Sequence, residues 1–166
     1  MSKANSYIGV QAVLESLNEH PAIRAILGWN PAALIDANFD RGELTLTVPK
    51  EQIAGACRAM RDGGYNFFED MTAVDWFPSS PRFQLSYHLL SHSYKEYIRL
   101  RVLLDAPDPA IDSITGVWPA ANFYEREVFD LFGIRFDGHP NLRRIMMPDD
   151  WQGHPLRKDY PVEGYR

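Results

Sequence analysis

Two alternating segments joined by a short connection constrain the fold of this chain more than any other feature of its sequence. In residues 83–90 apolar side chains occupy every second position, and the same period recurs in residues 97–104. A period of two is typical of β-strands that bury one face and expose the other to water. The two segments are separated by the six residues SHSYKE, so we expect them to pair antiparallel as a hairpin.

Helices and another hairpin are predicted in the first 50 residues. Apolar residues recur at helical spacing in residues 7–17, and Pro21 opens a second short helix that Gly28 can close. Proline suits the first turn of a helix, and glycine suits its C-terminal cap. Residues 32–48 hold two runs rich in apolar residues on either side of the turn Asp-Arg-Gly, which predicts a β-hairpin.

Residues 53–60 and 65–76 complete the pattern before residue 105. The first segment is a predicted helix with Cys57 on its core face, ended by the pair Gly63-Gly64, and the second is a further strand. Helices and strands come in blocks, without strict β-α-β alternation. The expected class is therefore α+β, with N-terminal helices and a mainly antiparallel sheet on which helices pack.

The segment PAANFYEREVFDLFG, residues 119–133, predicts one more helix, which follows a surface loop at residues 107–113. Its apolar stripe consists of Ala120, Tyr124, Val128, Leu131 and Phe132. Arg126 and Asp130 lie four residues apart and are expected to pair. Glu125 and Glu127 fall on the two flanks of the stripe. From the residues alone, these two carboxylates either reach water past the stripe or are held by partners.

Residues 134–166 cannot form long regular structure, because prolines and glycines interrupt them repeatedly. Large apolar side chains and charges of both signs accompany these breaks, whereas disordered linkers are usually poor in large apolar residues. We therefore expect an α+β domain of residues 1–133 followed by an extended C-terminal docking segment, residues 134–166. Two interpretations stay open: the segment orders against a partner, or it wraps its own sheet.

Composition and missing motifs argue against several classes of function. The net charge is -5, without a dominant cluster of Lys and Arg, so nucleic acid is not an expected partner. The single cysteine, Cys57, excludes an internal disulfide and an all-thiolate cluster held by this chain alone. Glycine-rich nucleotide loops, a Gly-x-Ser-x-Gly elbow and a run of 18 apolar residues are all missing. Candidate metal ligands are His139 and His154, with Asp149 or Asp150, although their spacing matches no diagnostic zinc pattern.

The run YEREVFDLFGIRFDGHPNLRRIMMPDDWQGHPLRKDYPVEGY, residues 124–165, closely resembles the signature of the 30 kDa subunit of respiratory complex I, the proton-pumping NADH:quinone oxidoreductase. The residues in register are Glu125-Arg126-Glu127, Asp130, Phe132-Gly133, Gly138-His139-Pro140, Leu142-Arg143-Arg144-Ile145, Asp149-Asp150-Trp151, Gly153-His154-Pro155 and Arg157-Lys158-Asp159. Upstream, the order of helices, hairpin and strands also fits. One departure is that many relatives extend well past the Gly-Tyr pair, whereas this sequence stops at Arg166.

The resemblance implies a structural subunit of the peripheral arm that holds no cofactor and is not catalytic by itself. FMN and iron-sulfur clusters would belong to partner subunits, and the expected neighbours are the 49 kDa-type subunit and the subunit with the terminal iron-sulfur cluster. The membrane would be reached only through the complex. The lack of a transit peptide favours a peripheral protein on the cytoplasmic side of a bacterial membrane. The residues that the resemblance assigns to subunit interfaces or salt bridges are Glu125, Arg126, Glu127, Asp130, His139, Arg143, Arg144, Asp149, Asp150, Trp151, His154, Arg157, Lys158 and Asp159.

Two other hypotheses stay open. The chain could be the equivalent subunit of a related membrane-bound hydrogenase, or of a dehydrogenase linked to cofactor F420 or ferredoxin, because those complexes share this module. A stand-alone metal-dependent enzyme built on His139, His154, Asp149 and Asp150 is the alternative from a different class.

Overall fold

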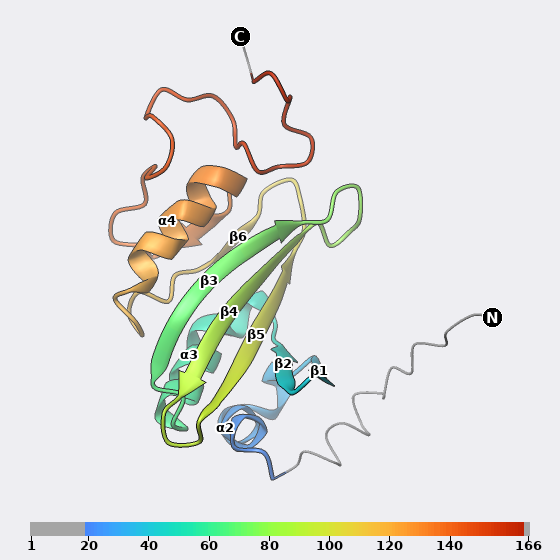
Figure 1. Ribbon diagram of the computed structural model, residues 1–166, viewed down its shortest axis with the longest axis vertical. Coiled ribbons are helices and arrows are strands. Elements are labelled where there is room, and N and C mark those ends of the chain that lie inside the picture. The colour runs from blue at the N-terminus through green and yellow to red at the C-terminus, as the bar shows by residue number, and fades with distance from the viewer. Residues whose placement is uncertain (1–18, 165–166) are drawn as a thin grey trace, which may run out of the picture.

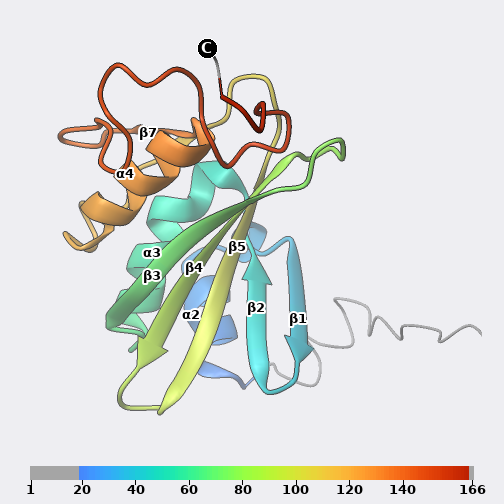
Figure 2. The same ribbon diagram turned by 45° about the horizontal axis from the view of Figure 1, so that its top comes forward.

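The computed structural model describes residues 19–164, whose strands form a twisted sheet with helices on one face (Figures 1 and 2). In spatial order the strands of this sheet are β1 (Asp36–Asp40), β2 (Glu43–Thr47), β5 (Glu96–Leu104), β4 (Phe83–Ser91) and β3 (Phe67–Asp75). Helices α2 (Pro21–Trp29) and α3 (Ile53–Asp62) cover one face, and α4 (Ala121–Phe132) lies beside β3. The class is α+β, as predicted.

The antiparallel hairpin predicted from the alternating segments is confirmed. Strands β4 and β5 pair along their whole length, from Phe83 opposite Leu104 to Ser91 opposite Glu96. The alternating apolar side chains of both strands, such as Leu85 and Leu100, are completely buried. They face α2 and α3 and form the centre of the core. Cys57 of α3 is also fully buried there, as predicted.

The first hairpin joins the sheet in a way that the sequence did not predict. Strands β1 and β2 pair antiparallel across a turn at Arg41 and Gly42, both with positive φ. Strand β2 then pairs with β5 in parallel, so the sheet is mixed. On the open face of the sheet, Arg101 Nε donates to the Thr47 hydroxyl of β2 at 2.9 Å, which fixes the lateral contact between the two strands.

Some element boundaries differ from the predictions. Gly28 does not close α2, because the helix continues to Trp29 and the Asn30 N–H donates to the Ile26 carbonyl. Tyr65 precedes β3, which begins at Phe67, since the Tyr65 N–H caps α3 through the Met60 carbonyl. Short 3-10 helices occupy Pro31–Ala33 and Lys50–Gln52. The helix predicted in residues 7–17 lies outside the described residues.

The expectation of a plain surface loop at residues 107–113 was wrong. Ala110–Asp112 form strand β6, which pairs in parallel with β7 (Arg135–Asp137). Ile111 of β6 is 3% exposed and Phe136 of β7 is 2% exposed, so both belong to the core. Flanking prolines concealed so short a strand from its local sequence.

Helix α4 ends where predicted, but its buried face is shifted. Gly133 adopts φ 70° and caps the helix through the Phe129 carbonyl. Ala120 is exposed, and Ala121 occupies the core position instead. The buried face also includes two carboxylates, Glu125 and Asp130.

The extended part of the chain begins after β7, at Gly138. Ile134 is fully buried with Phe136 in the core, so residues 134–137 pack with the α+β domain. The boundary expected after residue 133 stays a prediction. We call residues 138–164 the strap. It consists of turns and bends and lies against α4 (Figure 2).

Candidate functional site

One buried carboxylate, that of Asp130 in α4, holds the middle of the strap. Its Oδ2 accepts the backbone N–H groups of Ile145, Met146 and Met147 at 2.9, 2.7 and 2.8 Å. Its Oδ1 accepts Arg144 Nη1 at 2.5 Å, and the side chain has no exposed surface. Burial by itself raises the pKa of this carboxyl, but the donors outweigh burial and lower it. Asp130 is thus an anion in a cradle of N–H groups.

Arginine side chains reinforce this cradle from both directions. Arg144 Nη2 donates to the carbonyls of Trp151 and Gly153 at 2.9 and 3.0 Å, which ties two turns of the strap together. Arg126 donates to the carbonyls of Arg143 and Arg144 at 3.2 and 3.0 Å. The predicted pairing of Arg126 with Asp130 was therefore wrong, because Asp130 points inward to the strap.

The strap also caps the C-terminal end of α4. The last carbonyls of a helix lack partners within the helix. Here the Asp130 carbonyl contacts His154 Nδ1 at 2.9 Å, and the Leu131 carbonyl accepts the Leu156 N–H at 3.0 Å. The Phe132 carbonyl accepts Arg157 Nε at 2.6 Å. A Cβ on Gly133 would lie 2.5 Å from the His154 ring, so strap and helix end are fitted closely together.

The end of the strap is fastened to the sheet by a second buried carboxylate, Asp75 at the end of β3. Its Oδ2 accepts the Lys158 N–H at 2.8 Å and Arg82 Nη2 at 2.7 Å. Arg82 also donates to both carboxylate oxygens of Asp159, at 3.0 and 2.6 Å. Burial raises the pKa of Asp75, but the bonds from Arg82, the Lys158 N–H and the Phe77 N–H outweigh it and lower the pKa to about 2.

Glu125 is a third buried carboxylate, and it holds the loop before α4. Its oxygens accept the Ile114 N–H at 2.7 Å and the Ser113 hydroxyl at 2.6 Å. His139 Nε2 lies 3.9 Å from Glu125 Oε2, and both side chains are fully buried. Burial raises the pKa of Glu125 to about 7, against which these two hydrogen bonds act. Of the two flanking carboxylates, Glu125 is held by partners, whereas Glu127 is exposed.

While its backbone is fastened inward, the strap turns large apolar side chains outward. Met146 is 61% exposed, although its N–H is bonded to Asp130. The other exposed apolar side chains of the strap are Ile145, Trp151, Leu156 and Val162. A shallow cavity of about 400 Å³ is lined by Trp151, Tyr160 and residues 161–164, together with Pro155. The strap therefore presents an apolar, partly hollowed surface in a fixed conformation.

The residues that the resemblance assigned to interfaces divide into two sets. Those whose side chains bond to α4, to the sheet or to the loop before α4 are Glu125, Arg126, Asp130, His139, Arg144, His154, Arg157 and Asp159. Those that are exposed are Glu127, Arg143, Asp149, Asp150, Trp151 and Lys158. Sequence reasoning missed Asp75 and Arg82. An acidic residue at an inward position of the alternating strand β3 was the available signal.

The structure does not bring the candidate metal ligands together. Among residues 19–164, no group of three His, Cys, Asp or Glu side chains is placed to hold a metal ion. His139 contacts the Asn122 carbonyl and accepts the Asn141 N–H, and His154 contacts the Asp130 carbonyl. Within the same described residues, no helix is long and apolar enough to cross a membrane.

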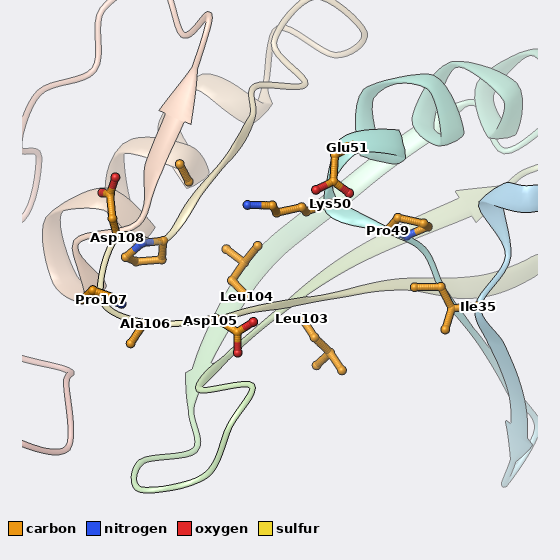
Figure 3. Close-up of a pocket in the computed structure, with 12 residues that line it drawn as sticks. Ile35, Pro49, Lys50, Glu51, Leu103, Leu104, Asp105, Ala106, Pro107 and Asp108 are labelled. Carbon is orange, nitrogen blue, oxygen red and sulfur yellow. The ribbon is translucent and has the colours of Figure 1, made fainter.

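A separate groove of about 450 Å³ lies where β5 continues past the end of β2 (Figure 3). Its floor includes Leu103 and Leu104, and Ile35 and Pro49 line one end. Lys50 extends over it towards residues 106–109, and Glu51 stands beside Lys50. The lining carries charges of both signs on an apolar floor, and it includes no histidine, cysteine, serine or threonine. It therefore offers a surface for contacts and lacks the nucleophile and base of a hydrolytic site.

Comparison with known proteins connects the strap to a family. The family model described as the respiratory-chain NADH dehydrogenase 30 kDa subunit matches residues 46–166, which include most of the sheet and the whole strap. A relative from Citrifermentans bemidjiense, named as the C-type subunit of NADH-quinone oxidoreductase, is 51% identical over 133 residues. The match covers 80% of this chain and 83% of the relative.

Two solved structures share the fold. A trypsin-resistant fragment of Nqo5 is 32% identical, with a TM-score of 0.60, and the match covers 78% of this chain and 98% of the fragment. A chain of the membrane-bound sulfane sulfur reductase, an archaeal respiratory membrane complex, is 27% identical with a TM-score of 0.74. That match covers 87% of this chain and 86% of the other.

Proposed function

The chain belongs to the family of the 30 kDa subunit of respiratory-chain NADH dehydrogenase, and on this premise we propose that it is a cofactor-free structural subunit in the peripheral arm of a proton-translocating NADH:quinone oxidoreductase. Other subunits would carry electrons from NADH through FMN and iron-sulfur clusters to quinone. This chain would contribute a docking surface. Its neighbours in this proposal are the 49 kDa-type subunit and the subunit with the terminal cluster. It would meet the membrane only through the complex, on the cytoplasmic side.

The observation that carries the proposal is the opposite orientation of backbone and side chains in the strap. Three neighbouring N–H groups, of residues 145–147, point inward to Asp130, while Met146 between them exposes 61% of its surface. A segment that served the domain alone would bury its large apolar side chains. A partner that covers them gains apolar contact with a surface whose backbone order is already set, which lowers the entropy cost of binding.

The exposed charges give the same surface a means of recognition. Arg143, Asp149, Asp150 and Lys158 are exposed on the strap, and Glu127 is exposed on α4. Charges around an apolar centre guide register and select partners more than they add affinity. We therefore assign these five residues to contacts with other subunits. The inward set, headed by Asp130 and Arg144, holds the surface in shape.

The test is to tag this chain in the organism that encodes it, in place of the native copy. We expect it to purify with an assembly that contains FMN and iron-sulfur clusters and oxidises NADH with quinone as acceptor. In a second strain, Met146→Asp and Leu156→Asp together should reduce incorporation at least tenfold, because charged groups would be forced into an apolar contact. Phe39→Asp is the matched control: Phe39 is 50% exposed on β1, on the opposite edge of the sheet from β3. A tagged chain found free, or equal incorporation of all variants, would refute the proposal.

A second candidate function rests on the likeness to the sulfane sulfur reductase chain. The chain could be the equivalent subunit of a related respiratory complex that does not use NADH. The higher identity to the NADH-quinone oxidoreductase relative favours the first proposal. Purified assemblies separate the two, since a related complex would lack FMN-dependent NADH oxidation while retaining this chain.

A further inference from the structure

The connection between β3 and β4 projects beyond the sheet (Figures 1 and 2) and carries two exposed aromatic side chains. Residues 76–81 read WFPSSP, without a charged residue. Trp76 is 52% exposed and Phe77 is 50% exposed. Neither side chain belongs to the strap, and neither was among the predicted interface residues.

This tip is built on a rigid base. The Asp75 carboxylate accepts the Phe77 N–H at 2.9 Å, and the Trp76 N–H donates to the Arg82 carbonyl at 2.8 Å. The Arg82 guanidinium carbon lies 5.0 Å from the centroid of the Phe77 ring and 4.9 Å from that of Phe83, within cation–π range. Two aromatic side chains are therefore presented with little conformational freedom to lose on binding.

The same base joins the tip to the strap. Asp75 accepts the Lys158 N–H, and Arg82 grips Asp75 and Asp159 at once. The Arg82 side chain is 11% exposed and that of Asp75 is 1% exposed, so these bonds are shielded from water and strong. Tip and strap form one continuous body, and a partner that lies on residues 158–164 is directly beside the tip.

We propose that Trp76 and Phe77 are a second anchor, which inserts into an apolar pocket of the same neighbouring subunit that receives the strap. This inference rests on the function proposed above and adds to it a second contact site. Tryptophan is over-represented among the few residues that dominate binding energy at protein interfaces. A rigid aromatic pair next to an ordered apolar strap has the composition of such a centre.

The charges at the base favour a protein pocket over a lipid surface. Three carboxylates, from Asp75, Asp105 and Asp159, and one guanidinium, from Arg82, bond to the tip or to one another. Loops that bind the anionic face of a membrane place several lysines and arginines beside their apolar residues. The tip has a net negative base instead, which anionic lipids would repel.

Site-directed photo-crosslinking in the assembled complex tests the position of the anchor. One strain carries a benzoyl-phenylalanine in place of Phe77, and another carries it in place of Met146 on the strap. We expect both to crosslink to the same neighbouring subunit. Crosslinks from Phe77 to lipid or to a different subunit, or their absence while Met146 crosslinks, would overturn the inference.

Competitive assembly tests the energetic part. Trp76→Ala with Phe77→Ala, carrying one tag, is co-expressed with the wild-type chain carrying another, and the ratio incorporated into the complex is measured. We expect a reduction of about 30-fold, as for loss of a dominant interface residue. Phe39→Ala with Tyr97→Ala is the matched control, because these side chains are 50% and 52% exposed on β1 and β5. The inference fails if both double variants incorporate equally.

The two proposals fail in different ways. If the strap variants with Met146→Asp and Leu156→Asp are excluded from the complex while the tip variants incorporate normally, the second anchor is refuted and the docking function stands. If neither set affects incorporation, both are refuted. Thermal unfolding of each isolated variant shows whether its loss of assembly reflects loss of fold, and the conservative change Trp76→Phe should restore assembly.

Discussion

Replacement of Asp130 by asparagine should release the strap without unfolding the sheet. Asp130 accepts four hydrogen bonds, three from backbone N–H groups and one from Arg144. An amide of the same size keeps one oxygen, and its NH₂ group must face donors where the second oxygen accepted them. Disrupting a buried charged pair by changing one partner costs about 3–5 kcal/mol. We expect about 3 kcal/mol here, because the remaining oxygen preserves part of the network.

The assay is hydrogen exchange followed by mass spectrometry on the isolated full-length chain. A local loss of about 3 kcal/mol corresponds to roughly 100-fold faster exchange at the N–H groups of residues 145–147. Peptides from β4 and β5 should keep their protection, because no strap residue pairs with these strands in the described part of the sheet. Asp149→Asn is the matched control, since Asp149 is an exposed acid on the same strap.

The effect should also depend on pH in a defined direction. The pKa of Asp130 is lowered in the folded chain from its ordinary value of 3.8. Its contribution is therefore present above that value and is lost as the pH falls through the folded pKa. Wild type and Asp130→Asn should differ fully at pH 7 and converge in strong acid. Equal exchange of the two chains at pH 7, or equal loss of protection in β4 and β5, would refute the reasoning.

Three other perturbations follow from the same contacts. Glu125 contacts no arginine or lysine among the described residues. Its pKa of about 7 exceeds the ordinary 4.5, so the stability it contributes is present below pH 4.5 and is lost as the pH rises towards 7. Glu125→Gln should remove this slope and be more stable than wild type by about 1–3 kcal/mol at pH 8, as measured by urea unfolding at both pH values; a flat wild-type profile would contradict this. A chain ending at residue 137 should keep its sheet by circular dichroism, whereas one ending at residue 133 loses buried Ile134 and Phe136 and at least about 3 kcal/mol; equal stability of the two would count against it. Arg144→Ala should loosen the strap in the isolated chain, while exposed Arg143→Ala should change its stability by less than about 0.5 kcal/mol yet weaken assembly by about 1–3 kcal/mol; the opposite order in unfolding and incorporation measurements would be the failure.

The parts of the fold that could be predicted are those fixed by local pattern. Alternation in residues 83–104 determined the β4–β5 hairpin, because side chains on a strand point alternately to core and solvent. Gly133 marked the end of α4, since glycine adopts the left-handed conformation of a helix cap at little cost. The parallel contact of β2 with β5 could not be predicted, because it joins segments about 50 residues apart and leaves no local period.

The candidate site was located by sequence, but its construction was not. Charges and apolar residues in the segment after residue 133 indicated a docking surface, and the helical spacing of Arg126 and Asp130 suggested a pair on the surface. In the structure, the Asp130 carboxylate instead binds three N–H groups from a strap 15 to 17 residues away. Helical periodicity shows which side chains share a face, but it cannot show which loop returns to meet them. For the same reason the clasp of Asp75 with Arg82 was missed.

The central claim is that a neighbouring protein of the same complex covers the outward side chains of the strap. Hydroxyl-radical footprinting of Met146 and Trp151, in the isolated chain and in the purified assembly, tests it most directly. The isolated chain should be oxidised readily at both, since they are 61% and 39% exposed. In the assembly we predict that their oxidation falls at least tenfold. Equal oxidation of Met146 and Trp151 in the free and assembled chain would contradict the account.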